Sequence, residues 1–299
     1  MEDFELTRKQ FDILTVLEKN NASMTQRDLE KATGFSLGTI NSSCKALESE
    51  GLIEGGTITA KGIMALEPYR VKRAVFIAAG FGSRLVPITL NTPKPLVRVN
   101  GERIIDTLLD AVTAVGIKDI VIVRGYLGEQ FDVLKNKYEG IRFLENPIYN
   151  EANNISSALI AKDLLENAYV LESDLLLKNK DLITKYQYSS NFLGIACDRT
   201  DDWCFVVKDG IIKEQKIGGE NCAQMVGISY WTQEDGRKLS EDIEITYNMP
   251  GGKERYWEQV PLRYCKNNYS VEVRYCEHSD ITEIDTFAEL KAIDKSYDV

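Results

Sequence analysis

Histidine is almost absent from this sequence of 299 residues, because His278 is its one instance. A chain with one imidazole has almost nothing from which to build a Ser-His-Asp triad or a histidine-based metal site. Cysteine is present but unpatterned, with no Cys-x-x-Cys and no Cys/His cluster among Cys44, Cys197, Cys204, Cys222, Cys265 and Cys276. Neither a zinc site nor a disulfide framework is therefore indicated, and we expect free thiols.

Long apolar runs are also missing. No segment approaches the roughly 20 residues that a membrane span needs, and the first residues, MEDFELTRKQ, do not form a signal peptide. Positive charge is in deficit, with 36 Lys and Arg against 46 Asp and Glu, so the net charge of −10 argues against general affinity for nucleic acid or anionic membranes. We expect a cytoplasmic protein without a membrane partner, and one long enough for two domains.

The first 70 residues are predicted to form a small separate unit. Three helices are expected, each opened by a hydroxyl side chain that can cap it: Thr7, Thr25 and Ser36. A two-stranded ribbon with a Gly-Gly turn follows over residues 52–59, and a last short helix ends the unit. This order resembles a winged helix-turn-helix domain over residues 1–70, with residues 39–43 in the position of the recognition helix.

The charge of this unit decides between two functions for it. Residues 1–70 carry 8 Lys and Arg against 11 Asp and Glu, and the third helix offers Lys45 beside Glu48 and Glu50. Because phosphate contacts dominate the affinity of proteins for DNA and need cations, DNA binding stays an alternative that we do not favour. We expect instead that the unit contacts a protein partner or holds a homodimer.

The stretch from Arg73 to Leu96 organises the second part of the chain. Apolar residues 74–79 predict a buried strand that leads into a Gly-x-Gly-Ser turn, whose small residues let backbone N–H groups approach an anion. Lys94 lies between two prolines, which predicts a stiff, non-helical arm carrying one positive charge. The expected phosphate-binding residues are Ala79, Gly80, Gly82, Ser83, Arg84 and Lys94. The alternative is that the turn merely starts a helix, as in many α/β proteins.

Strands and helices alternate after this stretch. We expect helices over 104–115, 129–138 and 155–165, and strands over 119–123, 141–145 and 169–172. Since each crossover is long enough for a helix, a mostly parallel sheet with helices on both faces is the economical architecture. Beyond Phe192, short strands and hairpin turns predict an antiparallel extension, and residues 286–295 predict a closing helix. The fold class of residues 71–299 is therefore α/β and Rossmann-like.

Two aspartates are candidates for a metal site. Asp174 follows a buried strand, at the sheet edge where α/β proteins bind ligands, and Asp285 lies just before the closing helix. Carboxylate oxygens at the ends of different elements suit a divalent ion that also binds phosphate. Either aspartate could instead be a helix cap, and for Asp285 that alternative is serious because it stands directly before the closing helix.

The chain from Val71 to Ile293 resembles the bacterial CTP:phosphocholine cytidylyltransferases, a branch of the nucleotidyltransferase family. The matching segments, in chain order, are Gly80-x-Gly82-Ser83-Arg84-Leu85, Pro93-Lys94-Pro95-Leu96, Gly125-Tyr126, Asn146-x-x-Tyr149, Asn153-Asn154-Ile155, Asp174, Asp202-Trp203, Gly227-Ile228-Ser229-Tyr230-Trp231, Tyr256-Trp257-Glu258 and Glu283-Ile284-Asp285. The chain departs from this family in having Leu127 where a basic residue is expected and Glu258 where aspartate is expected.

The resemblance implies a role for each element of the nucleotide site. Asp174 and Asp285 would bind Mg²⁺, while Lys94, Arg84 and the Gly-rich turn would hold the triphosphate of CTP. Asn153 and Asn154 would lie near the base and ribose, since an amide can donate and accept hydrogen bonds at once. The alternative for this Asn pair is a cap and a turn at the start of a helix.

The three tryptophans suggest how an acceptor is recognised. A quaternary ammonium has no hydrogen to donate, so aromatic faces, worth roughly 0.5–2 kcal/mol each, and a nearby carboxylate must hold it. We predict such a cage from the following residues: Asp202, Trp203, Tyr256, Trp257 and Glu258. Trp231 is expected in the core, and buried packing is the alternative for each tryptophan taken singly.

The first hypothesis for function is Mg²⁺-dependent transfer of CMP from CTP to phosphocholine, a phosphorylated amino-alcohol. No general base is needed, because a phosphomonoester has a second pKa near 6 and is already largely dianionic. Lys94 and Arg84 would then serve catalysis by positioning and charge neutralisation. Alternatives are another acceptor (2-aminoethylphosphonate, phosphoethanolamine or a sugar 1-phosphate), or a winged-helix regulator that senses a nucleotide or choline metabolite.

Overall fold

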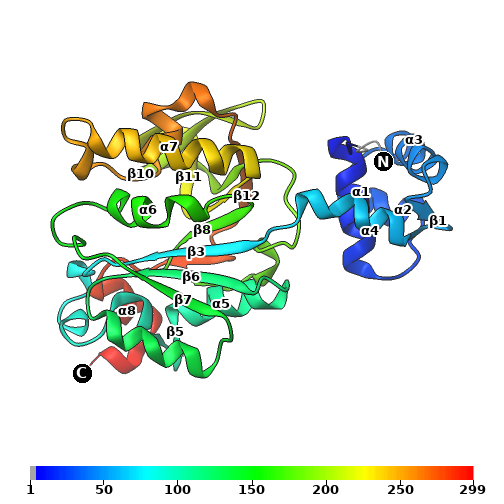
Figure 1. The fold of residues 1–299 in the computed structure, drawn as a ribbon. Coiled ribbons are helices and arrows are strands. Elements are labelled where there is room, and N and C mark those ends of the chain that lie inside the picture. The colour runs from blue at the N-terminus through cyan, green and yellow to red at the C-terminus, as the bar shows by residue number, and fades with distance from the viewer. Residues whose placement is uncertain (1–4, 299) are drawn as a thin grey trace. The chain divides into compact units, whose positions relative to one another are not determined.

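The computed structural model describes residues 5–298, which divide into two compact units (Figure 1). The first unit contains the described chain up to Arg70 together with Tyr186–Tyr188. The second contains Val71–Lys185 and the chain from Ser189 onward. The return of Tyr186–Tyr188 into the first unit is a feature that the sequence does not predict.

The first unit is a winged helix, as predicted. Its elements are α1 (Arg8–Asn20), α2 (Gln26–Thr33), α3 (Leu37–Ser49), β1 (Ile53–Glu54), β2 (Thr57–Ile58) and α4 (Ala60–Leu66). Thr7 caps α1 and forms a reciprocal capping box with Gln10, so two backbone N–H groups at the helix start have partners. Ile13, Leu14 and Leu17 of α1 are fully buried in the core of this unit.

A central sheet of seven strands forms the second unit, in the order β10-β12-β11-β8-β3-β6-β7. These strands are β3 (Arg73–Ala78), β6 (Asp119–Arg124), β7 (Ile141–Glu145), β8 (Ala168–Glu172), β10 (Asn191–Lys208), β11 (Ile211–Trp231) and β12 (Glu272–Cys276). Strands β8, β3, β6 and β7 run parallel, whereas β11 pairs antiparallel with β8 and with β10. The predicted parallel sheet with an antiparallel extension is confirmed.

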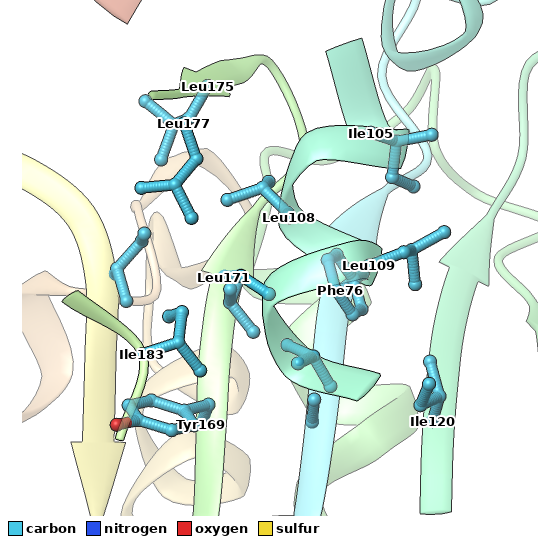
Figure 2. Close-up of a cluster of buried hydrophobic side chains, with 14 of the residues drawn as sticks. Phe76, Ile105, Leu108, Leu109, Ile120, Tyr169, Leu171, Leu175, Leu177 and Ile183 are labelled. Carbon is cyan, nitrogen blue, oxygen red and sulfur yellow. The ribbon is translucent and has the colours of Figure 1, made fainter. Parts of the chain in front are cut away.

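Helices cover both faces of this sheet (Figure 1). The helices are α5 (Ile104–Ala114), α6 (Ile155–Ala161), α7 (Gln233–Asn248) and α8 (Phe287–Ile293). Four short strands form two small antiparallel pairs, β4 (Arg98–Val99) with β5 (Glu102–Arg103) and β9 (Leu175–Leu177) with β13 (Ile281–Glu283). Side chains alternate along β3, so Phe76 packs with Leu108 of α5 (Figure 2), whereas Val75 belongs to the cluster that contains α6 and α7. None of the described helices is long and apolar enough to cross a bilayer.

Two local expectations differ from the structure, and one helix was not expected. Lys94 begins a short 3₁₀ turn, Lys94–Leu96, rather than a non-helical arm. The helix expected over 129–138 is a 3₁₀ helix over Gly128–Asn136. Helix α7 was not predicted, because its buried face includes Asp242 and Thr246 as well as Leu239, which weakens the apolar repeat that reveals a helix.

Candidate functional site

A cleft of about 640 Å³ opens in the second unit beyond the carboxyl ends of β3 and β8. It brings together most of the predicted site residues: Gly80, Gly82, Ser83, Arg84, Lys94, Asn153, Asn154, Asp174, Asp202, Trp203, Tyr256, Glu258 and Asp285. Two predicted residues, Ala79 and Trp257, do not line it, and both are buried. The position matches the general rule that open α/β sheets bind ligands outside the carboxyl ends of their strands.

The Gly-rich turn forms one wall of the cleft. Gly82 has a φ of 67°, in the left-handed region that glycine adopts without strain. A Cβ added at Gly82 would lie 3.0 Å from the Cβ of Lys94, so the turn and this lysine are packed against each other. The hydroxyl of Thr89 donates to the carbonyl oxygen of Gly82 at 3.0 Å and helps to hold the turn in this conformation.

Lys94 joins the two predicted metal ligands. Its Nζ donates to Asp174 Oδ2 at 2.7 Å and to Asp285 Oδ1 at 2.9 Å, and its side chain is 10% exposed. Burial alone would lower the pKa of Lys94, but the two carboxylates raise it above its usual value, so the ammonium stays charged. Arg84, which is largely exposed, donates to the same oxygen of Asp285 at 2.8 Å.

Pairing of two short strands explains how these distant aspartates meet. Strands β9 and β13 pair antiparallel, with Glu283 opposite Leu175. Just beyond this register the backbone N–H of Ile284 donates to the carbonyl oxygen of Asp174 at 3.3 Å. The segment before α8 is thereby held against the end of β8, and Asp285 is placed beside Asp174.

Two further carboxylates belong to this cluster and were not predicted as site residues. Oxygens of Glu172, Asp174 and Glu283 lie within 4.8 Å of one another. Loss of solvent, reinforced by Asp174 and Asp285, raises the pKa of Glu283 to about 8. Glu283 stands two positions before Asp285, a spacing that places both on one side of an extended chain, so the sequence did contain a signal for it.

Asn153 and Asn154 hold the segment that forms the opposite wall. The amide of Asn153 donates to the carbonyl oxygen of Glu254 at 3.2 Å, and that of Asn154 donates to Glu258 Oε1 at 3.2 Å. The carbonyl oxygen of the Asn154 side chain accepts the backbone N–H of Trp257 at 2.9 Å. Both amides therefore hold the segment 254–258 in place at the edge of the cleft.

Glu258 and Glu172 are a pair of carboxyl groups that face each other in the cleft. Burial raises the pKa of Glu258, and burial together with the neighbouring Glu258 and Asp174 raises the pKa of Glu172 well above its usual value. Gly227 leaves the space for this pair, since a Cβ there would lie 2.3 Å from Glu172 Oε2. The end of the cleft that they line therefore favours a cationic ligand group.

The aromatic side chains divide between the cleft and the core. Trp203 and Tyr256 line the cleft, with ring centroids 5.7 Å apart in a T-shaped arrangement. The prediction that Trp257 joins them was wrong: it is 2% exposed and packs against Trp231 and Phe192. Its neighbours Tyr256 and Glu258 line the cleft instead. Trp231 lies in the core, as expected.

Comparison with known proteins agrees with this geometry. Residues 73–202 match the nucleotidyl transferase family, and residues 4–57 match the MarR family. The chain is 35% identical to the 2-aminoethylphosphonate cytidylyltransferase of Lancefieldella rimae, over 75% of this chain and 92% of that protein. It is 33% identical to the choline-phosphate cytidylyltransferase of Streptococcus pneumoniae, over 75% and 97%. The chain therefore belongs to the nucleotidyl transferase family.

Solved structures lead to the same conclusion. The CTP:phosphocholine cytidylyltransferase LicC from Streptococcus pneumoniae superposes with a TM-score of 0.70 and 31% identity, over 76% of this chain and 99% of that one. An inositol-1-phosphate CTP transferase from T. maritima, at 19% identity and a TM-score of 0.60, shares the fold. The second unit is thus an enzyme domain of the cytidylyltransferase group, preceded by a MarR-like winged helix.

Proposed function

We propose that this chain transfers CMP from CTP to phosphocholine, giving CDP-choline and pyrophosphate, with Mg²⁺ as cofactor. The observation that supports this most directly is the position of Lys94, whose Nζ contacts both Asp174 and Asp285 in the same cleft as the Gly-rich turn. A buried cation between two carboxylates, packed against a Gly-rich turn, suits a triphosphate and its counter-ion.

The proposed reaction needs no general base. The acceptor phosphate, largely dianionic at neutral pH, attacks the α-phosphorus of CTP in line, and pyrophosphate leaves with the electron pair of the broken P–O bond. Lys94 and Arg84 would neutralise the charge that builds on the triphosphate oxygens. The Gly-rich turn would orient the β- and γ-phosphates, and Asn153 and Asn154 would lie near the base and ribose.

The carboxylates of the cleft fit a magnesium ion. Asp174 Oδ1 is buried and has no hydrogen-bond partner among residues 5–298, which is unfavourable unless a ligand completes it. Asp174 and Asp285 would hold the ion, with Glu283 as a third ligand, and such oxygen donors are those that Mg²⁺ prefers. When bound, the ion supplies charge neutralisation of the phosphates and polarises the reacting phosphorus.

The acceptor end of the cleft supports a cationic substrate. Trp203 and Tyr256 offer partly exposed rings, and Asp202 supplies the negative charge that a quaternary ammonium needs beside its aromatic contacts, with the carboxyl group of Glu258 in the same cleft. A second candidate acceptor is 2-aminoethylphosphonate. The carboxyl groups of the half-buried Glu172 and the buried Glu258 favour it, because a primary ammonium can donate hydrogen bonds to them.

The test is pyrophosphate release by the purified chain, with CTP, UTP, dTTP or ATP against phosphocholine, 2-aminoethylphosphonate, phosphoethanolamine and glucose 1-phosphate. We expect turnover with CTP and phosphocholine. Asp174→Asn should abolish it, because this variant removes a charged ligand of the proposed Mg²⁺ ion. If 2-aminoethylphosphonate is used with a higher kcat/KM than phosphocholine, the second candidate replaces the first. Absence of turnover in every combination would end the enzymatic proposal.

A substitution at Trp203 separates the two acceptors further. Trp203→Leu should lower kcat/KM for phosphocholine roughly tenfold, the value of one lost cation–π contact, and should change it little for a primary ammonium. Tyr275→Leu is the matched control, because Tyr275 is an exposed aromatic residue that does not line the cleft. An equal loss for both acceptors would show that Trp203 packs against the site without selecting a quaternary ammonium.

A further inference from the structure

A second groove, of about 510 Å³, lies beside the cleft. Trp203 and Gln215 line both of them, so the two cavities are neighbours. Strand β11 forms one side of the second groove, and the segment from Leu262 to Lys266 forms another. None of the residues assigned to the triphosphate, the metal ion or the acceptor lies in it, except Trp203.

The second groove is positively charged in a negatively charged protein. Four cations line it, Lys213, Lys216, Arg263 and Lys266, against one carboxylate, Glu214. Within the described chain, none of these four side chains has an ion pair or a hydrogen bond, and the guanidinium of Arg263 lies 5.6 Å from the centroid of the Tyr264 ring. Elsewhere in this unit cations are commonly paired, as Lys94, Arg73 and Arg124 are. With 46 acidic residues against 36 basic ones, acidic partners are not scarce.

Four cations around one groove repel one another, although water screens the exposed Lys213, Arg263 and Lys266, and an anion bound among them would relieve this repulsion. Lysine ammonium groups and an arginine fork are the groups that bind phosphate oxygens best. The cavity is large enough for a chain of two or three phosphates. We propose that the second groove binds a polyphosphate anion, at a site separate from the triphosphate site beside the Gly-rich turn.

The assignment does not depend on the acceptor or on turnover, so it can hold or fail independently of the proposed function. Inorganic pyrophosphate, which the proposed reaction releases, belongs to the class of ligand that the groove fits. A headgroup of an anionic lipid carries the same phosphate chemistry, but the groove is a hollow in which Trp203, Gln215 and Leu262 lie among the charged side chains. This shape favours a small free anion over a flat membrane surface.

Calorimetric titration of the full chain with inorganic tripolyphosphate, without divalent ions, tests the proposal. Lys213→Glu/Lys266→Glu should weaken binding to the groove by at least about tenfold, because two attractive charges become repulsive. Lys118→Glu/Lys208→Glu is the control with the same change in net charge, since both of its lysines are exposed and lie outside the two cavities. Binding should be unchanged in this control.

Lys94→Ala separates the groove from the cleft, because it removes the buried cation of the cleft alone. Tripolyphosphate binding that survives Lys94→Ala and is lost in the groove variant supports the proposal. Binding that Lys94→Ala abolishes, or that the groove variant leaves intact, overturns it. In a second arm the chain is mixed with vesicles of phosphatidylglycerol and phosphatidylcholine. Groove-dependent binding to vesicles without binding of tripolyphosphate would assign the groove to a lipid surface and reject the free anion.

Discussion

At the scale of single residues, the cleft depends on carboxyl groups that the fold keeps close together against their mutual repulsion. Glu172, Asp174 and Glu283 share a space of less than 5 Å, and Lys94 supplies the compensating charge through Asp174. Removal of one carboxylate therefore has two opposite effects, less repulsion in the free protein and weaker attraction for a cation. The balance between these effects distinguishes a metal site from an accidental cluster of acids.

Glu283→Gln tests this balance. The variant should be at least as stable as the parent chain without Mg²⁺, because the charged form of Glu283, whose pKa is raised to about 8, is disfavoured in this cluster and the amide carries no charge. Its apparent affinity for Mg²⁺ in turnover should fall by at least about tenfold, as a carboxylate ligand is replaced by a neutral amide. The measurements are the Mg²⁺ dependence of pyrophosphate release and the rise of Tm with Mg²⁺, which reports binding to the folded state.

Glu277→Gln is the control for this prediction, because Glu277 is an exposed carboxylate that does not line the cleft. It should respond to Mg²⁺ as the parent chain does. If Glu283→Gln lowers Tm without Mg²⁺ and keeps the parent's Mg²⁺ dependence, Glu283 is a structural residue and no metal ligand.

At the scale of elements, the sequence predicts the helices and strands that show a clear apolar periodicity or a capping residue. The strands of the parallel sheet are apolar on both faces, and three helices of the first unit open on capping hydroxyls, so these elements were found. Residues Lys94, Asp174 and Asp285 were found from their local motifs. The pairing of β9 with β13, which places the two aspartates together, is a long-range contact that no local pattern encodes.

Burial is the second property that the sequence did not resolve. Tyr256 and Trp257 are adjacent aromatic residues, and both were predicted to contact the acceptor. The side chain of Tyr256 is 43% exposed, whereas that of Trp257 is 2% exposed. Which of them faces the cleft depends on the packing of Trp257 against Phe192 and Trp231, and these come from two other strands. Glu172 was not predicted for the same reason. The sequence does not show whether a carboxylate at the end of a strand is exposed or packed against other side chains.

Electrostatic contacts tie the strands of the parallel sheet together at one end. Asp119, at the start of β6, accepts hydrogen bonds from Arg73 of β3 at 2.5 Å and from Arg142 of β7 at 2.6 Å. Burial alone would raise the pKa of Asp119, but the two arginines lower it below its usual value. A carboxylate with a lowered pKa in the folded state stabilises that state at neutral pH, and this contribution is lost as pH falls through the folded pKa.

Asp119→Asn should therefore lower the free energy of unfolding by about 1 kcal/mol at pH 7, since the groups are partly exposed. The loss should shrink as pH falls below about 4, because Asp119 of the parent chain is protonated there in the unfolded state and, at still lower pH, in the folded state. Asp201→Asn, which disrupts a pair with Arg199 that is almost fully exposed, should have little effect at any pH. Thermal unfolding of the three proteins between pH 3 and pH 7 measures the difference. A loss of the same size at pH 3 and pH 7 would contradict the electrostatic account.

At the scale of the whole molecule, the chain enters the first unit twice. Tyr188, far from the first helices in sequence, donates its hydroxyl to the carbonyl oxygen of Leu6 at 3.0 Å and stacks on Tyr69 at a centroid distance of 5.4 Å. Phe11 packs against both tyrosine rings, and the guanidinium of Arg8 lies 5.3 Å from the ring of Tyr188. Residues 186–188 therefore complete the core of the winged helix. This holds for any partner that the unit contacts, DNA included.

Tyr188→Ala should destabilise the first unit by about 2 kcal/mol, because a half-buried ring leaves a space among Phe11, Tyr69 and Leu6. Tyr188→Phe keeps the ring and should cost only about 1 kcal/mol for the lost hydrogen bond. Amide hydrogen exchange of the full chain measures both effects: protection in α1 should fall in the order parent, Phe variant, Ala variant, while amides of β3 in the second unit serve as the internal reference. Unchanged exchange in α1 of the Ala variant would mean that the unit folds without residues 186–188, and that its stability resides in the first 70 residues alone.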